Sequence, residues 1–98
     1  MPTTLDALML HADDNTATAF RDLKAGETVR MRLGRDLLPF TVTEDIPYGH
    51  KFATRDVAVG GDVVKYGEVI GQASAAISAG AHAHVHNVES KRARGDWS

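Results

Sequence analysis

A short pattern that recurs three times along the chain constrains its fold more than any other feature. Each copy has an apolar residue, two variable residues, a glycine, two variable residues and a small or branched apolar residue. The copies span residues 23–29, 57–63 and 77–83. The glycine can adopt the positive φ of a tight turn, and the apolar residues can anchor the turn and the strand after it. Because the copies are unequally spaced, the pattern predicts a compact set of turns and strands and not a solenoid.

Alternating residue types predict several short strands. Residues 28–33 alternate apolar and charged side chains, and residues 16–20 alternate threonine or phenylalanine with alanine. A helix capped by Asn15 or Thr16 is the alternative for the second segment, but its threonines favour a strand. Residues 68–79 could accept a helix, although glycine and serines interrupt them. Further strands are expected at residues 8–11, 37–42 and 83–86, with short pieces between 57 and 70. We therefore predict an all-β fold, a small barrel-like domain with short strands and glycine-rich turns.

Length and composition place the chain among small globular domains. Its 98 residues suffice for one core, and we expect an N-terminal extension at 1–7, the domain at 8–89 and a mobile basic tail at 90–98. A formal net charge of −2 argues against a nucleic-acid partner. No apolar run approaches the ~20 residues that cross a bilayer, and no signal-peptide pattern opens the chain. Cysteine is absent, which excludes disulfides and thiolate metal sites, and we expect a cytoplasmic protein.

The sequence His82-Ala83-His84-Val85-His86 is the strongest chemical signal in the chain. On a strand, the three imidazoles would share one face, with their Cα atoms roughly 6.5–7 Å apart. Two neighbouring rings could then bind one metal ion, and a site of histidines without cysteine would suit iron, manganese or zinc. The alternative is a polar strand face that only titrates near pH 6.5.

Four other residues are candidates for contact with a substrate. His50 and Lys51 follow a turn at residues 46–49, where they could donate to an anion and exchange protons, or could simply be exposed. His11 ends an apolar segment and could equally be satisfied by turn backbone. Tyr66 is expected to pack its ring with the hydroxyl at the rim.

Four segments in the right order carry a family resemblance. They are residues 10–15, 44–53, 64–71 and 80–87. Together they resemble the SAF domain of the altronate/galactarate dehydratase family, which occurs as a small subunit or an N-terminal domain. The resemblance covers about residues 8–96. It implies a β-clip fold and a hydro-lyase that removes water from a hexonic or hexaric acid with a divalent metal such as Fe²⁺, with Mn²⁺ or Zn²⁺ as alternatives.

The resemblance also implies a division of labour between two chains. This chain would be the accessory subunit of a lyase, inactive alone. A separate large catalytic subunit would complete the site and would hold most of the metal's ligands. His50 and Lys51 would be catalytic, and His11 and Tyr66 would bind the sugar-acid substrate. The metal ligands would be His84 and His86, with His82 as a weaker third.

Several alternatives stay open at this point. A related branch, the sulfolactate sulfo-lyases, has a free small subunit of this kind and releases sulfite where the dehydratases release water. The chain could instead be a non-catalytic module that binds a carboxylate or a metal. It could also be a purely structural domain that positions or oligomerises the large subunit, and it could form homo-oligomers. None of these readings involves nucleic acid or a membrane.

Overall fold

The computed structural model describes residues 5–90, and in that range it contains nine strands and no helix. The strands are β1 (Ala7–Met9), β2 (Thr16–Ala19), β3 (Thr28–Leu33), β4 (Asp36–Thr41), β5 (Lys51–Ala53), β6 (Asp62–Lys65), β7 (Glu68–Ala73), β8 (His82–Ala83) and β9 (Val88–Ser90). The all-β prediction is therefore confirmed. Residues 68–79, for which a helix was an alternative, contain strand β7. Residues 1–4 and 91–98, which belong to the expected extension and tail, lie outside the described range.

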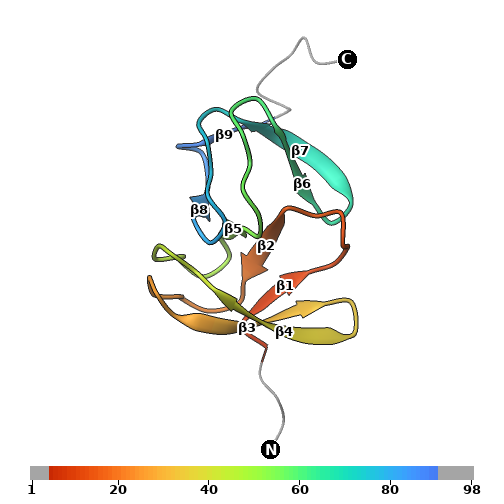
Figure 1. Cartoon of the computed structure of the whole chain (residues 1–98), viewed down its shortest axis with the longest axis vertical. Coiled ribbons are helices and arrows are strands. Elements are labelled where there is room, and N and C mark those ends of the chain that lie inside the picture. Colours follow the sequence, from red (N-terminus) through yellow and green to blue (C-terminus); the bar gives the residue numbers. More distant parts are fainter. Residues whose placement is uncertain (1–4, 91–98) are drawn as a thin grey trace, which may run out of the picture.

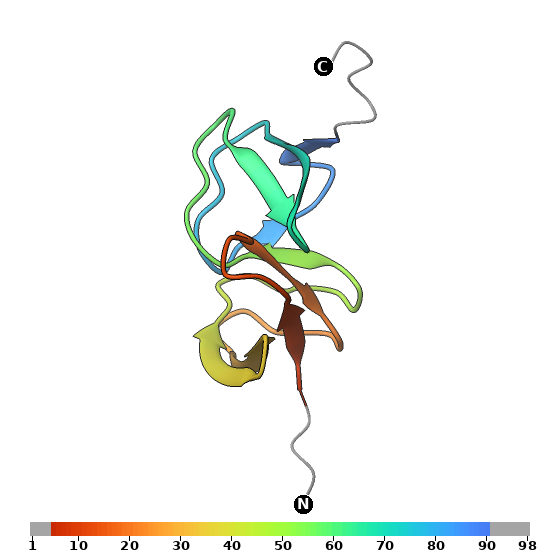
Figure 2. The same cartoon turned by 90° about the vertical axis from the view of Figure 1, so that its right-hand side faces the viewer.

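The strands form two separate sheets (Figure 1). Six strands follow the order β4-β3-β1-β2-β5-β8, and three follow the order β6-β7-β9. The three-stranded sheet lies above β1, β3 and β4 in Figure 1, with β5 and β8 between them, and Figure 2 shows the same layers from the side. The expected barrel does not form: among the described strands, β4 and β8 remain as edges of the six-stranded sheet, and no strand of one sheet pairs with a strand of the other.

The recurring turn is built as the sequence predicts. Its glycines Gly26, Gly60 and Gly80 have φ angles of 85°, 81° and 90°. A fourth copy, which we did not predict, spans residues 46–52 with Gly49 at φ 82°. In each copy the residue after the glycine donates its N–H to the carbonyl three positions earlier, and the next strand begins one residue later. The apolar anchors then pair across the molecule, Leu23 with Ile46 and Val57 with Ile77.

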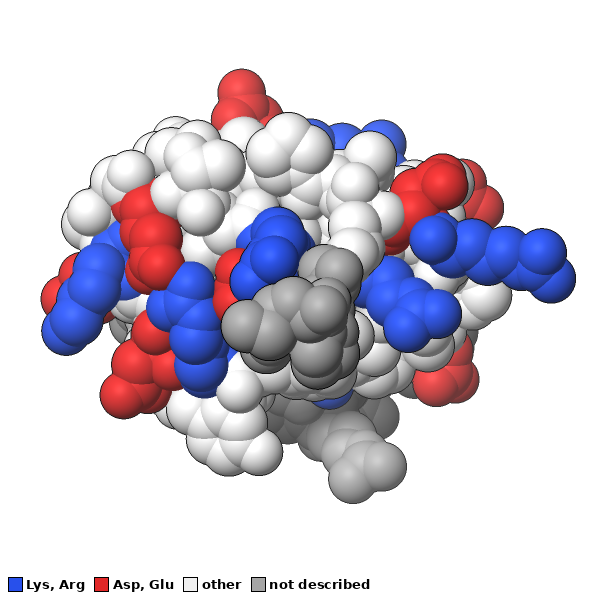
Figure 3. All heavy atoms as spheres, turned by 90° about the horizontal axis from the view of Figure 1, so that it is seen from below, with Lys and Arg blue, Asp and Glu red and all other residues white. Residues whose placement is uncertain are grey.

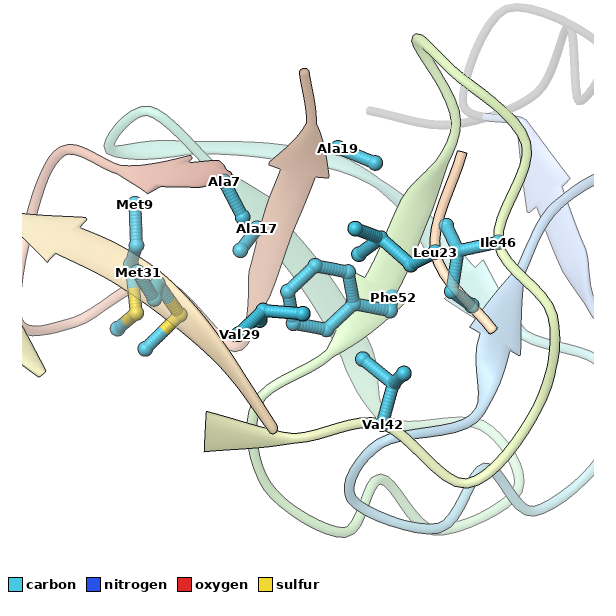
Figure 4. Packing of buried hydrophobic residues seen from close by; sticks show 10 residues of the cluster. All are labelled: Ala7, Met9, Ala17, Ala19, Leu23, Val29, Met31, Val42, Ile46 and Phe52. Carbon is cyan, nitrogen blue, oxygen red and sulfur yellow. The ribbon is translucent and has the colours of Figure 1, made fainter. Parts of the chain in front are cut away.

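The larger hydrophobic cluster surrounds Phe52, which is fully buried on β5 (Figure 4). The Phe52 ring stacks on Phe40, with ring centroids 5.5 Å apart. The buried members of the cluster are Ala7, Met9, Ala17, Ala19, Leu23, Val29, Met31, Val42, Ile46 and Phe52. Because burying one phenylalanine contributes about 1.5–3 kcal/mol, Phe52 holds β5 firmly in place. The two residues before it, His50 and Lys51, are positioned as a consequence.

The turn between β1 and β2 joins the two sheets. The Asn15 side chain accepts a hydrogen bond from the Val64 amide and donates one to the Asp62 carbonyl, both at 2.8 Å. The Thr16 hydroxyl donates to the Val64 carbonyl at 2.9 Å. These contacts attach β6 to β2 and so fix the three-stranded sheet relative to the six-stranded one.

Asp14 makes the most buried of these connections. Its side chain has no exposed surface, and its carboxylate accepts the amides of His11 (3.2 Å), Tyr66 (3.0 Å) and Gly67 (2.8 Å). Tyr66 and Gly67 form the two-residue turn between β6 and β7, with φ angles of 54° and 80°. Positive φ at both positions is typical of a type I′ hairpin turn, and it is an unusual conformation for tyrosine. Asp14 therefore fixes this turn to the β1–β2 turn.

A charged network stabilises the start of the domain. The buried Asp6 carboxylate accepts the Arg30 amide at 2.8 Å and the Arg21 guanidinium at 3.0 Å, and Arg21 also pairs with Glu27. Burial alone would raise the pKa of Asp6, but these hydrogen bonds outweigh burial and hold the pKa below its ordinary value.

Figure 3 shows positive and negative side chains interspersed over the lower face of the molecule. Within residues 5–90, no helix is long and apolar enough to span a membrane.

Candidate functional site

The candidate site forms where β5 meets β8, at one edge of the six-stranded sheet. These strands are antiparallel, with Lys51 opposite Ala83 and Phe52 opposite His82. Continuing this register by one residue brings His50 opposite His84. Their rings are nearly parallel, with centroids 4.2 Å apart and an interplanar angle of 21°. The β5–β8 pairing thus joins a histidine from the fourth turn repeat to the histidine-rich segment.

The predicted strand at residues 83–86 is wrong. Strand β8 contains only His82 and Ala83, and the chain then turns back over residues 84–87. Asn87 shapes this turn: its side chain accepts the His84 amide at 2.9 Å and donates to the His82 carbonyl at 2.8 Å. An asparagine that satisfies nearby backbone in this way favours a turn over an extended strand. The three histidines therefore do not alternate along one strand face.

Three imidazoles nevertheless gather at one place. One ligand atom from each of His50, His82 and His84 lies within 4.8 Å of the other two. His50 Nδ1 and His82 Nε2 are 2.9 Å apart, which is a hydrogen bond in which one nitrogen donates and the other accepts. The His82 amide also donates to Glu44 Oε1 at 2.8 Å, which fixes the start of β8. All three histidines are half-buried, so they are shielded from water but reachable.

His86 lies at the margin of this cluster. It sits in the exposed part of the turn, with its ring centroid 5.2 Å from that of His82 and tilted by 39°. It is not one of the three residues whose ligand atoms converge. Of the three expected metal ligands, His82 and His84 are brought together, and His50 takes the place that His86 was expected to fill.

Lys51 and His84 line one cavity beside the cluster. The cavity holds about 240 Å³ and is otherwise lined by Ile70, Val85, Val88 and Ser90. Because successive strand residues point to opposite faces, Lys51 projects away from the face that carries Phe52. The cavity is mostly apolar with a few polar groups, as is usual for small-molecule sites.

The surroundings shift the pKa values of these groups toward their neutral forms. Burial lowers the pKa of the Lys51 amine, and the nearby charge of Lys65 adds to the effect. Burial likewise lowers the pKa values of His82 and His84, and the neighbouring His50 lowers both further. Neutral amines and imidazoles have free lone pairs, which is the form that can accept a proton or bind a metal.

Tyr66 and His11 both lie at the turn between β6 and β7. The Tyr66 hydroxyl donates to the Thr18 hydroxyl at 3.3 Å, and Thr18 is opposite Lys51 in the β2–β5 pair. The side chain of His11 is exposed, and its ring lies against Gly67, where an added Cβ would come within 3.0 Å of it. Tyr66 is thus a near neighbour of Lys51, whereas His11 borders the β6–β7 turn and is not part of the three-histidine cluster.

Sequence reasoning missed two features of the site. The position of His50 in the cluster could have been suspected from the fourth copy of the turn pattern, because that copy places a strand start at the residue after His50. Asn87 carried a weaker signal: an asparagine after the last histidine suggests a turn. The sequence pattern predicts a strand across this segment and gives Asn87 no role.

The donor set of the cluster fits a divalent transition metal. Nitrogens bound to one metal at about 2.0–2.1 Å lie roughly 3.0–3.4 Å from each other. The His50–His82 pair is already at 2.9 Å, and the third nitrogen falls within 4.8 Å, a distance that small side-chain rotations can close. Three imidazoles without thiolate suit zinc, iron(II) or manganese(II).

Fold and site together define a small all-β domain that carries histidines and a lysine at a sheet edge. The chain belongs to the family of the altronate/galactarate dehydratase SAF domain, which it matches over residues 5–91. The resemblance seen in the sequence is therefore confirmed.

Three relatives illustrate how much of each protein is shared. The chain is 45% identical to altronate dehydratase of Escherichia coli (strain K12) over 80 residues, which are 82% of this chain and 15% of that enzyme. It is 49% identical to the alpha subunit of (2R)-sulfolactate sulfo-lyase of Chromohalobacter salexigens over 55 residues, 56% of this chain and 58% of that subunit. The same subunit of Paracoccus pantotrophus is 42% identical over 52 residues, 53% of this chain and 78% of the subunit. The chain thus spans a small part of the dehydratase and more than half of each sulfo-lyase subunit.

Proposed function

We propose that this chain is the accessory subunit of a two-component, cytoplasmic sugar-acid hydro-lyase of the altronate/galactarate dehydratase type. The observation that carries the proposal is the gathering of His50, His82 and His84 beside the cavity of Lys51, within a domain of this family. The substrate would be a hexonic or hexaric acid. The chain alone would be inactive, because a cavity of about 240 Å³ at an open edge does not enclose the reacting carbons of such an acid.

The chemistry that this site could support is β-elimination. Removing the proton α to a carboxylate builds negative charge on the carboxylate oxygens, which cationic or hydrogen-bonding groups must stabilise. Lys51, with its lowered pKa, is suited to accept a proton or to donate to the carboxylate. In the absence of a metal, His50 or His84 could donate a proton to the departing hydroxyl group; with a metal on the cluster, these histidines would hold the metal. A bound divalent metal, iron(II) by the family resemblance, would supply positive charge for the same purpose.

Tyr66 is a candidate to orient the substrate. Its backbone is held at a φ of 54°, which is costly for tyrosine, and glycine would be easier to accommodate there. A tyrosine at that position suggests that its phenol is used. Through Thr18 the phenol is close to Lys51 and could donate to a substrate hydroxyl. We retain His11 as a second substrate contact, at the β6–β7 turn.

Exposed apolar side chains support a partner at this site. Val85, at the tip of the turn beside the cavity, is 82% exposed. Val85, Val88 and Ser90 also line a second depression that continues from the first. A large catalytic subunit that covers this apolar rim would bury it and close the cavity over its substrate.

A sulfo-lyase subunit is the second candidate. Two relatives are named as the alpha subunit of (2R)-sulfolactate sulfo-lyase, and the chain covers 58% and 78% of their lengths. The elimination would be the same, with sulfite as the leaving group. The cavity of Lys51 and His84 suits either substrate, since both are carboxylates. The leaving group therefore distinguishes these two candidates.

The test begins with purification of the native complex. The tag-free chain is captured from its own cells, the co-purifying large chain is identified, and the two are co-expressed. The complex is then assayed with altronate, galactarate and sulfolactate, and formation of the keto-deoxy acid product or of sulfite is followed. We expect dehydration by the complex and none by this chain alone. Normal turnover by the isolated chain, or a stable chain with no catalytic partner, would contradict the proposal.

A further inference from the structure

We propose that this chain by itself binds one divalent transition-metal ion, with His50, His82 and His84 as its three protein ligands. The inference deepens the proposed function, since it assigns the metal site to the small chain. It replaces the expectation that the histidine-rich segment alone supplies the ligands and that the large subunit holds most of the metal. Its basis is the geometry of the cluster and not the activity of a complex.

The ligand atoms come from two segments that the β5–β8 pairing fixes. His50 precedes β5, and Phe52, buried in the core, anchors that strand. His82 and His84 flank Ala83, which is also fully buried, so both are held by a residue between them. A metal site needs ligands on well-supported backbone, because each misplaced ligand weakens binding. A metal ion would replace the hydrogen bond of 2.9 Å between His50 Nδ1 and His82 Nε2, and the three ligand atoms, which lie within 4.8 Å of one another, would converge on it by side-chain rotation.

The surrounding hydrogen bonds support this backbone. Asn87 accepts the His84 amide and donates to the His82 carbonyl, and Glu44 accepts the His82 amide. These contacts fix the peptide groups on both sides of the metal ligands. They hold in place the backbone that carries the ligands, which a precise metal site requires.

Three imidazoles leave coordination positions free, which gives the site a function. Structural zinc sites use four protein ligands, whereas catalytic sites keep three and leave a place for water or substrate. Of the three ligands, His84 also lines the cavity of Lys51, so this cavity adjoins the cluster. A carboxylate that enters the cavity could reach a metal at the cluster and the Lys51 amine together. The ligand class that fits is therefore a small organic acid bound through its carboxylate.

The test uses the full, tag-free chain and metal ions alone. Zinc(II) is titrated calorimetrically, and cobalt(II) is followed by its visible absorption, which reports the ligand geometry. We expect one ion per chain with a dissociation constant in the micromolar range. His50→Ala and His84→Ala should each weaken binding by more than about tenfold. The control His11→Ala removes a histidine outside the cluster and should change binding by less than about twofold.

A second measurement needs no substitution and guards against variants that fail to fold. In nitrogen-15 spectra of the histidine side chains, zinc should shift the ring nitrogens of His50, His82 and His84 and leave those of His11 and His86 in place. No saturable binding by the wild-type chain would overturn the inference. So would binding that His86→Ala abolishes and His50→Ala does not. Either result would leave the two-component lyase proposal to be judged by the activity of the complex.

Discussion

Replacing Asp14 should destabilise this domain more than any other single surface-loop substitution, because its carboxylate joins two turns that are far apart in sequence. It is fully buried and accepts three backbone amides at 2.8–3.2 Å. Hydrogen bonds to charged groups contribute about 1.5–3 kcal/mol each. Asp14→Ala would leave three amides without their acceptor. Removal of a buried charge offsets part of this loss, so the free energy of unfolding should fall by about 3–5 kcal/mol.

That loss is large for a domain of this size, whose total stability should be about 5–15 kcal/mol. Urea unfolding followed by circular dichroism measures it directly. With a denaturant slope of about 1–3 kcal/mol per molar, the midpoint should fall by about 1 M or more. Asp14→Asn retains one acceptor oxygen and should lose less, about 1–2 kcal/mol.

The matched control is the neighbouring residue Asp13, which is exposed. Asp13→Ala should change the free energy of unfolding by no more than about 0.5 kcal/mol. If Asp14→Ala and Asp13→Ala had the same midpoint within error, the three amide contacts would not stabilise the fold. The account of how the two sheets are joined would then be refuted.

Three further predictions concern the fold and the substrate side of the site. In the folded chain the pKa of Asp6 is below its ordinary value, because its hydrogen bonds outweigh its burial. The stabilising contribution of Asp6 is therefore complete above about pH 4 and is lost as the pH falls through the folded pKa. Asp6→Asn should remove this acid sensitivity from pH-dependent thermal unfolding, and an unchanged profile would contradict the assignment. Gly80→Ala should lower the free energy of unfolding by about 1–3 kcal/mol more than Gly34→Ala does. Both glycines have positive φ, but of the two only Gly80 would place a Cβ against backbone, 2.9 Å from the Thr41 carbonyl oxygen. Equal urea midpoints of the two variants would show that this close approach is relieved at no cost. Tyr66→Gly should keep or raise the unfolding temperature, because glycine relieves the strain of the positive φ. The same substitution should lower kcat/KM of the reconstituted complex by about tenfold or more. Unchanged kinetics would show that Tyr66 is not part of the substrate site.

The turns could be predicted from sequence because they depend on residues next to each other. The glycine at the fourth position of each repeat and the apolar anchors on either side are local signals, and Gly26, Gly60 and Gly80 adopt the expected positive φ. Strands β2 and β3 likewise follow the alternation of their own residues. Local pattern was enough to establish the all-β class and most strand positions.

The site could be predicted only in part, because its geometry depends on pairing between distant segments. His50 meets His84 through the β5–β8 register, which joins residues more than thirty positions apart, and neither segment contains a signal for its partner. The histidine-rich segment is a turn because Asn87 satisfies backbone groups that a strand would have paired. Asp14 looked like one of several turn residues, and its contacts with Tyr66 and Gly67 cannot be read from its neighbours. Residue types suggested the chemistry, and non-local pairing decided which residues share it.

The activity of the reconstituted complex with substitutions in this chain tests the central claim most directly. His50→Ala and Lys51→Ala should each lower kcat/KM for the sugar acid by about a hundredfold or more, with complex formation intact by size-exclusion chromatography. The control Arg35→Ala, in the β3–β4 turn at the opposite end of the six-stranded sheet, should leave kcat/KM unchanged. If the complexes carrying His50→Ala and Lys51→Ala turned over as fast as the Arg35→Ala complex, this domain would only position its partner and would contribute no residue to the active site.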